Sequence, residues 1–185
     1  MKVFISWSGP ISKQVATYLH DWLPLVLQYT KPYMSSEDIH AGARWFGSVG
    51  SELQLSNFGL FGLTWDNLDA PWLHFEAGAI AKFVDHSNVI PMLFRFRPSN
   101  ISGPFTNFQA KTFQEDEVFD VLKSINKAAG EEALDDVRLQ KVFQSMWGEL
   151  YRNISGISEN VEEDIQGRSS TLDDIQRTSW KSYLF

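Results

Sequence analysis

The segment PWLHFEAGAIAKF, residues 71–83, places a single acidic residue among apolar neighbours. Pro71 can open a helix there, because its missing N–H is not needed at the first helical position. At about 100° per residue, Glu76 falls inside a broad apolar arc formed by Trp72, Leu73, Phe75, Ala79, Ile80, Phe83 and Val84. A carboxylate in such an arc is costly unless it is paired, and a low dielectric strengthens its action on positive charge nearby. Glu76 is therefore either a catalytic candidate or a structural acid paired with a backbone group or an arginine.

The signatures of several common enzyme classes are missing from the sequence. No GxGxxG follows the first apolar segment, and neither GxxxxGK[ST] nor GxSxG occurs, which disfavours dinucleotide binding for hydride transfer, P-loop NTPases and serine hydrolases. The four histidines show no HExxH or similar pairing, and there is no cysteine to form a disulfide, a thiolate zinc site or a nucleophile. We therefore expect no metal and no resident cofactor.

Length and composition favour one globular domain. The chain has 185 residues, of which 43% are hydrophobic and 14% aromatic, enough for a sizeable core. Its net charge is −7, and residues 101–185 carry nine basic and fifteen acidic side chains, which argues against nucleic acid as the main ligand. The N-terminus does not read as a signal peptide, and the longest apolar run, VIPMLF, cannot span a bilayer. We expect a soluble, cytoplasmic protein with no membrane contact.

The elements that position Glu76 can be predicted from the hydrophobic pattern, in which short apolar segments alternate with helical patterns. Strands are expected at residues 2–7, 31–34, 58–64, 89–96 and 110–113. Helices are expected from Ser12 to about Val26, where Pro24 marks a kink or the last turns, and at residues 46–55, 71–84, 115–129 and 135–151. This alternation predicts an α/β fold: a flavodoxin-like three-layer sandwich with a mostly parallel five-stranded sheet.

The predicted topology also places the candidate site. Ligands of such sheets bind beyond the carboxyl ends of the strands, so residues 6–9, the polar loop 35–45 and the start of the 71–84 helix should converge on one rim. From residue 153 the apolar pattern weakens. We therefore expect a domain over residues 1–152, followed by a polar linker and short tail over 153–185, which could end in a helix.

Taken in this order, the segments resemble a bacterial Toll/interleukin receptor (TIR) domain from Lys2 to about Tyr151. The resemblance is carried by KVFISWSG, by the loop YMSSEDIHAGARW, by FGLFGLT followed by DAPWLHFEAGAIAK, and by VIPMLF. The WxxxE pattern from Trp72 to Glu76 lies where TIR NAD+ hydrolases carry their catalytic glutamate. The 35–45 loop lacks the proline typical of many receptor adaptors, which makes adaptor-style signalling less expected.

The resemblance implies an NAD+ nucleosidase that cleaves the nicotinamide–ribose bond, with NAD+ as substrate rather than cofactor. The products would be nicotinamide plus ADP-ribose or a cyclic or conjugated form, in bacterial anti-phage defence signalling. Oxidised nicotinamide leaves as a neutral molecule, so one carboxylate facing the ribose can suffice. Ordinary glycosidases need two carboxyl groups because their leaving alkoxide must be protonated.

The neighbours of Glu76 on the predicted rim receive roles from the same resemblance. Hydroxyls and backbone N–H groups after the first strand could contact ribose or phosphate, a basic loop residue could meet a phosphate, and tryptophans could stack on a ring. Each also has an ordinary interpretation as a turn, a solvated charge or core packing. The candidate substrate-binding residues are Ser6, Trp7, Ser8, Gly9, Arg44, Trp45 and Trp72.

Two other functions stay open. The chain could be a non-catalytic TIR module that acts through protein contacts alone, or an enzyme similar to nucleoside 2-deoxyribosyltransferases, which also place a carboxylate at a glycosidic carbon. The resemblance further implies TIR–TIR self-association on activation, with the 35–45 loop as both gate and interface. A chain this short would act with a separate effector or sensor protein, or be one domain of a longer protein.

Overall fold

The structure is a computed structural model that describes residues 1–34, 52, 55–83 and 88–157. Its centre is a five-stranded sheet with the order β2-β1-β3-β4-β5. Every neighbouring pair in this sheet is parallel. The strands are β1 (Lys2–Ser6), β2 (Lys31–Met34), β3 (Phe58–Leu63), β4 (Asn88–Leu93) and β5 (Lys111–Thr112).

This strand order is that of the flavodoxin-like fold, as the sequence predicts. The chain moves from β1 to β2 on one side and then returns to place β3 on the other side of β1. Helices that leave β1 and β3 therefore diverge to opposite faces, and the carboxyl ends of these two strands mark the switch point at which open α/β sheets bind ligands. β1 and β3 lie inside the sheet and read as continuous apolar runs, as expected for strands covered on both faces.

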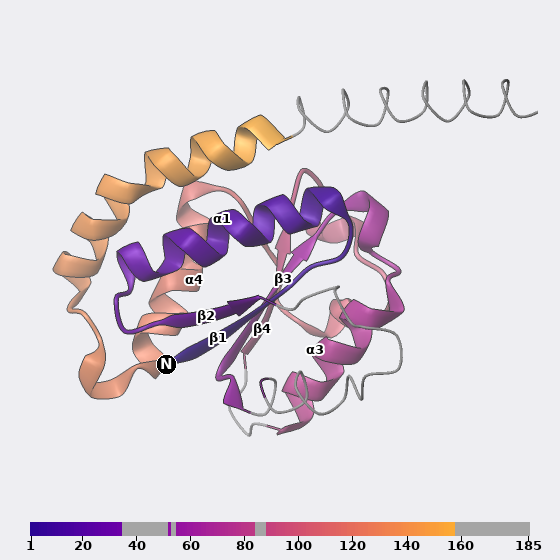
Figure 1. Ribbon diagram of the computed structural model, residues 1–185, viewed down its shortest axis with the longest axis horizontal. Coiled ribbons are helices and arrows are strands. Elements are labelled where there is room, and N and C mark those ends of the chain that lie inside the picture. The colour runs from indigo at the N-terminus through magenta and orange to yellow at the C-terminus, as the bar shows by residue number, and fades with distance from the viewer. Residues whose placement is uncertain (35–51, 53–54, 84–87, 158–185) are drawn as a thin grey trace, which may run out of the picture.

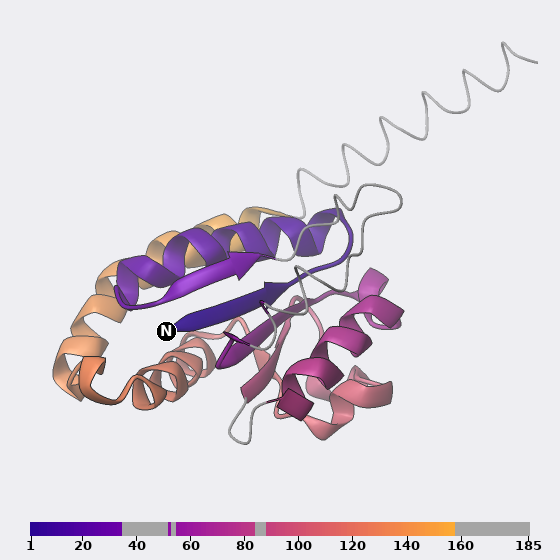
Figure 2. The same cartoon turned by 60° about the horizontal axis from the view of Figure 1, so that its bottom comes forward.

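Helices cover both faces of the sheet (Figures 1 and 2). On one face, α1 (Pro10–Val26) packs beside the helix over residues 136–157, and Trp22 Nε1 donates a hydrogen bond across to the carbonyl of Met146 at 3.0 Å. Helix α4 (Glu115–Ala128) contributes to the same apolar core. On the other face, α3 (Pro71–Phe83) and short 3-10 turns build a second core with Phe61, Leu73 and Phe105.

Local chemistry explains where the helices begin. α1 starts with Pro10 after Gly9, whose φ of 83° lies in the left-handed region that favours glycine. Pro24 sits in the last turn, and the helix ends at Val26. α4 has three acidic residues in its first turn and Lys127 in its last, which complements the helix dipole at both ends.

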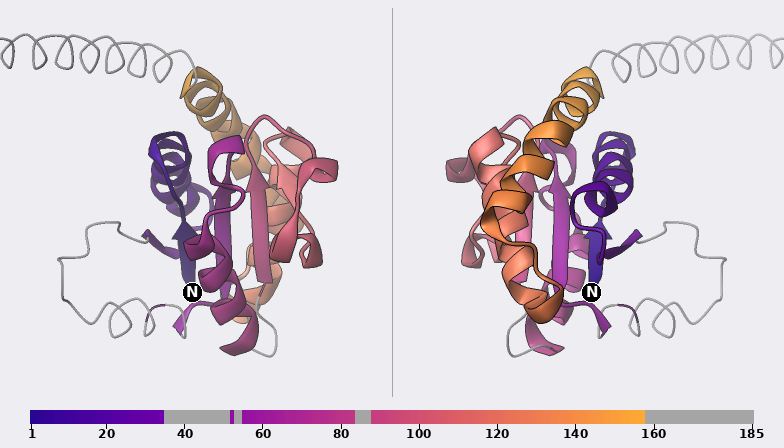
Figure 3. Two further views of the ribbon diagram at one scale, coloured as in Figure 1. Left: turned by 90° about the vertical axis from the view of Figure 1, so that its right-hand side faces the viewer. Right: turned by 90° about the vertical axis from the view of Figure 1, so that its left-hand side faces the viewer.

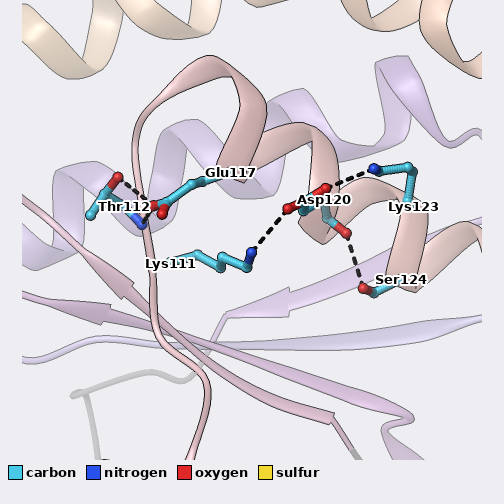
Figure 4. A network of polar contacts seen from close by, with 6 residues as sticks. All are labelled: Lys111, Thr112, Glu117, Asp120, Lys123 and Ser124. Atoms are coloured by element: carbon cyan, nitrogen blue, oxygen red, sulfur yellow. Dashed lines mark hydrogen bonds and ion pairs between the residues drawn. The ribbon is translucent and has the colours of Figure 1, made fainter. Parts of the chain in front are cut away.

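The short strand β5 is fixed to α4 by a network of polar contacts (Figure 4). The backbone N–H and hydroxyl of Thr112 both donate to the Glu117 carboxylate. Lys111 and Lys123 hold Asp120 at 3.0 and 2.7 Å, and their hydrogen bonds keep the pKa of that carboxyl below its ordinary value. The backbone pairing of β5 with β4 is too short to fix this two-residue strand, so side-chain contacts with α4 hold it in place.

The last described helix continues beyond the predicted domain boundary. Residues 153–157 are helical, and Ile154 and Ile157 are buried in the core with Leu150. The expected end of the domain at 152 is therefore too early, because Leu150, Ile154 and Ile157 continue the helical spacing across a stretch whose Ser and Gly suggest a linker. Residues 158–185, the rest of the predicted tail, lie outside the described residues (Figure 3).

This correction predicts that the end of the helix stabilises the domain. Ile154→Ala should lower the free energy of unfolding by about 2–4 kcal/mol, because it removes a buried side chain and leaves a cavity. The exposed neighbour Asn153→Ala is the matched control and should change stability by less than about 0.5 kcal/mol. Urea unfolding measures both. Equal, small effects would show that the core ends before residue 153.

Candidate functional site

The candidate site lies between the carboxyl ends of β1 and β3. Ser6 is the last residue of β1 and pairs in register with Phe61 of β3. Glu76 comes from the second turn of α3, which follows β3 and covers this face. The two side chains meet at the topological switch point, where open α/β sheets bind their ligands.

Glu76 is fully buried, with 0% of its surface exposed. The Ser6 hydroxyl donates a hydrogen bond to its Oε2 atom. Its Oε1 atom is buried and has no hydrogen-bond partner within the described part of the chain. Among those same residues, Glu76 forms no ion pair. An acid with one satisfied oxygen and one unsatisfied oxygen is costly in an apolar environment, so the site leaves unused capacity to bind a polar or cationic group.

The environment raises the pKa of Glu76 to about 7. Burial is the main cause, since it disfavours the charged form. Hydrogen bonding by Ser6, and then by the Trp72 side chain, acts in the opposite direction and favours the anion. Near neutral pH the carboxyl group can therefore exist in either form, which is the range in which enzymes tune catalytic acids and bases.

Close packing of α3 on the sheet fixes the position of Glu76. Leu73, Ala77 and Ile80 share its face and are completely buried. Gly59 of β3 allows this approach, because a Cβ atom there would lie 2.5 Å from Cδ1 of Ile80. A larger residue at 59 would require a shift of the Ile80 side chain and of the Phe61 ring, whose Cε2 atom would lie 2.9 Å away.

One member of the predicted apolar arc does not face the core. Phe75 is 41% exposed, and its ring lies 5.4 Å from that of Trp72, which is half-buried. The buried residues Leu73, Ala77 and Ile80 lie further around the helix from Phe75 than Glu76 does, which is itself about 100° from Phe75. Glu76 thus lies at the edge of the buried face that is nearer Trp72, rather than at the middle of the apolar arc that the sequence indicates.

The alternation of side chains along β1 separates two candidates that are adjacent in sequence. Ser6 points toward α3, whereas Trp7 joins the core on the α1 face and is 3% exposed. The ammonium group of Lys13 lies 4.7 Å from the centre of its ring. The structure therefore brings Ser6 to Glu76 but places the Trp7 indole in core packing.

A second polar cluster, which sequence reasoning missed, joins the loops after β1 and β3. The Asn67 side chain donates to the carbonyls of Ser8 and Gly62 at 3.0 and 2.9 Å and accepts from the Thr64 N–H at 2.8 Å. Ser12 donates to the Gly62 carbonyl at 2.6 Å. These contacts fix the rim beside Ser6. The signal in the sequence was the position of Asn67, which follows a strand and lies three residues after Thr64, a residue type that caps helices.

The remaining predicted contacts divide into three groups. Ser8 and Gly9 lie at the rim, but the Ser8 backbone is already used by Ser12 and Asn67. Trp72 lies one turn before Glu76, as the WxxxE spacing predicts for a helix. Its side chain lowers the pKa of Glu76 by hydrogen bonding. Arg44 and Trp45, together with the rest of the 35–45 loop, lie outside the described residues.

No cluster of three or more His, Asp or Glu side chains suited to a metal ion occurs in residues 1–34, 52, 55–83 and 88–157. Within the same ranges, no helix has the length and apolarity needed to cross a bilayer.

Comparisons with known proteins add little to this geometry. No family model matches the chain, and no curated protein matches it. Among solved structures, an azoreductase from Bacillus anthracis str. Sterne is similar, with 7% sequence identity and a TM-score of 0.39, over 83% of this chain and 97% of that one. The strand order and the site define the class: a flavodoxin-like α/β protein in which Glu76, the one buried carboxyl group among the described residues, lies at the switch point.

The raised pKa of Glu76 predicts a pH-dependent stability. The folded pKa of about 7 lies above the ordinary 4.5, so the folded state binds the proton more tightly. Its stabilising contribution is complete below about pH 4.5 and is lost as pH rises through about 7. Glu76→Gln removes this loss. Between about pH 4 and pH 8.5 the variant should gain about 3 kcal/mol relative to wild type in urea unfolding. A pH-independent difference would show that the acid is not desolvated.

Proposed function

We propose that the protein is an NAD+ nucleosidase of the TIR type, with Glu76 as its catalytic residue. The observation that carries this proposal is the buried, uncompensated carboxyl group at the switch point, hydrogen-bonded by Ser6 and flanked by Trp72. The WxxxE context of the sequence supplies the reaction class. The products would be nicotinamide plus ADP-ribose or a cyclic isomer, used in bacterial anti-phage defence signalling.

The reaction needs little from the protein beyond this one group. The bond between the ribose anomeric carbon and the nicotinamide nitrogen breaks, and its electron pair leaves with the nitrogen, which becomes neutral. Positive charge moves to the ribose as an oxocarbenium-like centre. Water then adds to the anomeric carbon and releases one proton, or a nucleophile within the same ADP-ribose adds and closes a ring.

Glu76 is suited to stabilise the charge that develops on the ribose. Its environment has a low dielectric, in which a carboxylate acts more strongly than in water. Burial, Ser6 and Trp72 account for its pKa, with no contribution from another described acid. A lone carboxylate matches a leaving group that requires no protonation, in contrast to the paired acids of ordinary glycosidases.

The burial of Glu76 determines how a substrate can reach it. The side chain is completely buried in the single chain, so a substrate can reach it only after the site opens. We include TIR–TIR self-association in the proposal as the event that activates the enzyme, together with a separate effector or sensor protein. Nicotinamide release is therefore measured over a range of protein concentrations, because self-association increases with concentration.

The direct test is nicotinamide release from NAD+, followed by chromatography, for wild type and Glu76→Gln. Gln keeps the size and removes the charge, and the rate should fall by about 10²-fold or more. The exposed acid change Glu149→Gln is the matched control and should keep the wild-type rate. Melting curves exclude misfolding. If wild type releases no nicotinamide at any concentration, or if Glu76→Gln releases it normally, the proposal is wrong. Release of free base from deoxynucleosides instead would favour a deoxyribosyltransferase.

The Ser6 hydrogen bond predicts a specific change in the pH profile. The value of kcat/KM should rise as Glu76 ionises, with a midpoint near 7. Ser6→Ala removes a donor that favours the anion, so the midpoint should move upward by about one pH unit. Ser145→Ala, an exposed serine on the 136–157 helix, should leave the midpoint unchanged. A downward shift in Ser6→Ala would contradict the assignment.

A further inference from the structure

A separate cavity of about 610 Å³ opens at the carboxyl ends of β4 and β5. Its walls are residues 93–97 after β4, residues 112–114 after β5, and the face of the 136–157 helix that carries Trp147 and Tyr151. The volume lies within the range of small-molecule sites. The position is also favourable, because ligands of parallel sheets bind at the carboxyl ends of the strands.

The charge of this cavity differs from that of the whole protein. The chain carries a net charge of −7, yet the described residues of the lining include Arg95 and Arg97 and no acidic residue. The Arg97 side chain is exposed, and its guanidinium forms no ion pair within the described ranges. Two guanidinium groups without a carboxylate favour an anion, and Arg suits phosphate in particular.

Arg95 is held in place at a cost to its backbone. Its φ of 64° lies in the left-handed region, which is unusual for a residue other than glycine. Its Nη2 atom donates to the Ser155 carbonyl at 2.8 Å, and its guanidinium lies 5.1 Å from the centre of the Phe94 ring. Backbone strain of this kind is concentrated at functional sites, and here it fixes a cation at the mouth of a cavity.

Aromatic surface lies beside these cations. The rings of Trp147 and Tyr151 are 5.6 Å apart at their centres, and Tyr151 is 53% exposed. Phe96 and Phe113 also line the cavity. The exposed ring of Tyr151, backed by the half-buried Trp147 and lying beside the arginines, provides a stacking surface for a planar ring of a ligand that carries negative charge.

The cavity is distinct from the Glu76 site. The helix over 136–157 lies on the α1 face of the sheet, where Trp147 packs against the core that contains Trp22. Glu76 lies beneath α3 on the opposite face, near β1. A ligand in this cavity would leave the Glu76 carboxyl group untouched.

We propose that this cavity binds a nucleoside monophosphate. The base stacks on Tyr151 and Trp147, and the phosphate is held by Arg97 together with Arg95. This site does not depend on the proposed NAD+ cleavage, and it gives the protein a second place for a nucleotide-type ligand.

Calorimetric titration of the full chain with AMP tests the proposal. Glu76→Gln protein is used beside wild type, so that binding is separated from any reaction at the other site. Both proteins should bind AMP with the same affinity. Adenosine, which lacks the phosphate, and ribose 5-phosphate, which lacks the base, should each bind at least about tenfold more weakly. Equal binding of AMP and ribose 5-phosphate would overturn the stacking half of the proposal.

Variants then locate the binding. Arg97→Gln and Tyr151→Leu both change exposed side chains, so the fold should be retained, and each should weaken AMP binding by about tenfold or more. Arg138→Gln, an exposed arginine on the same helix outside the cavity, is the matched control. The proposal is overturned if wild type binds no AMP at millimolar concentration, or if binding is lost in Glu76→Gln and kept in Arg97→Gln and Tyr151→Leu.

Discussion

The hydrogen bond from Ser6 to Glu76 is the contact on which the account of this protein depends. It joins the end of β1 to the second turn of α3 inside an apolar layer. A core of this kind normally excludes a carboxyl group, and here only one of its two oxygens is satisfied within the described structure. Burial of the Glu76 carboxyl group thus destabilises the fold at its switch point. A destabilising group at a ligand-binding position, with no structural contact that explains it, indicates function.

Two features of the parallel sheet make this arrangement possible. Side-chain alternation along β1 sends Ser6 to the α3 face and Trp7 to the α1 face, so the polar hydroxyl and the large indole never compete for space. Gly59 in β3 leaves room for the Ile80 side chain to pack on the strand, and Glu76, one turn earlier on α3, reaches Ser6. The Asn67 side chain holds the rim beside them together, because it donates hydrogen bonds to the carbonyls of Ser8 and Gly62.

Much of the fold could be predicted from the sequence because it depends on local periodicity. The five strand segments, the parallel sheet and the burial of Glu76 all follow from apolar spacing. Element ends were less accurate: the final helix runs to residue 157, because Ile154 and Ile157 continue the apolar spacing into the core through a stretch whose Ser and Gly indicate a linker. The exposure of Phe75 was missed for a similar reason, because a wide apolar arc does not show which part of it meets the sheet.

The candidate site was only partly predictable. Glu76 stands out as a lone acid at a buried helical position, whereas Asn67 acts through tertiary hydrogen bonds to loops that are distant in sequence. Arg95 and Arg97 form a cavity only because β4, β5 and the last helix end side by side. Such convergence is a property of the topology, and a pattern within one segment cannot indicate it. The chemistry at Glu76 likewise comes from the WxxxE context and stays a proposal.

The central claim is that a buried carboxyl group with a pKa of about 7 faces a substrate cation. A carbon-13 NMR titration of the Glu76 carboxyl group, with and without a carbocyclic NAD+ analogue that cannot be cleaved, tests this most directly. The account predicts a midpoint near 7 in the free protein and a fall of about one unit or more when the pyridinium is bound. The analogue with a reduced nicotinamide ring, which carries no positive charge, should not produce that fall in pKa. A midpoint near the ordinary value in the free protein, or the same midpoint with and without the cationic analogue, would contradict the account.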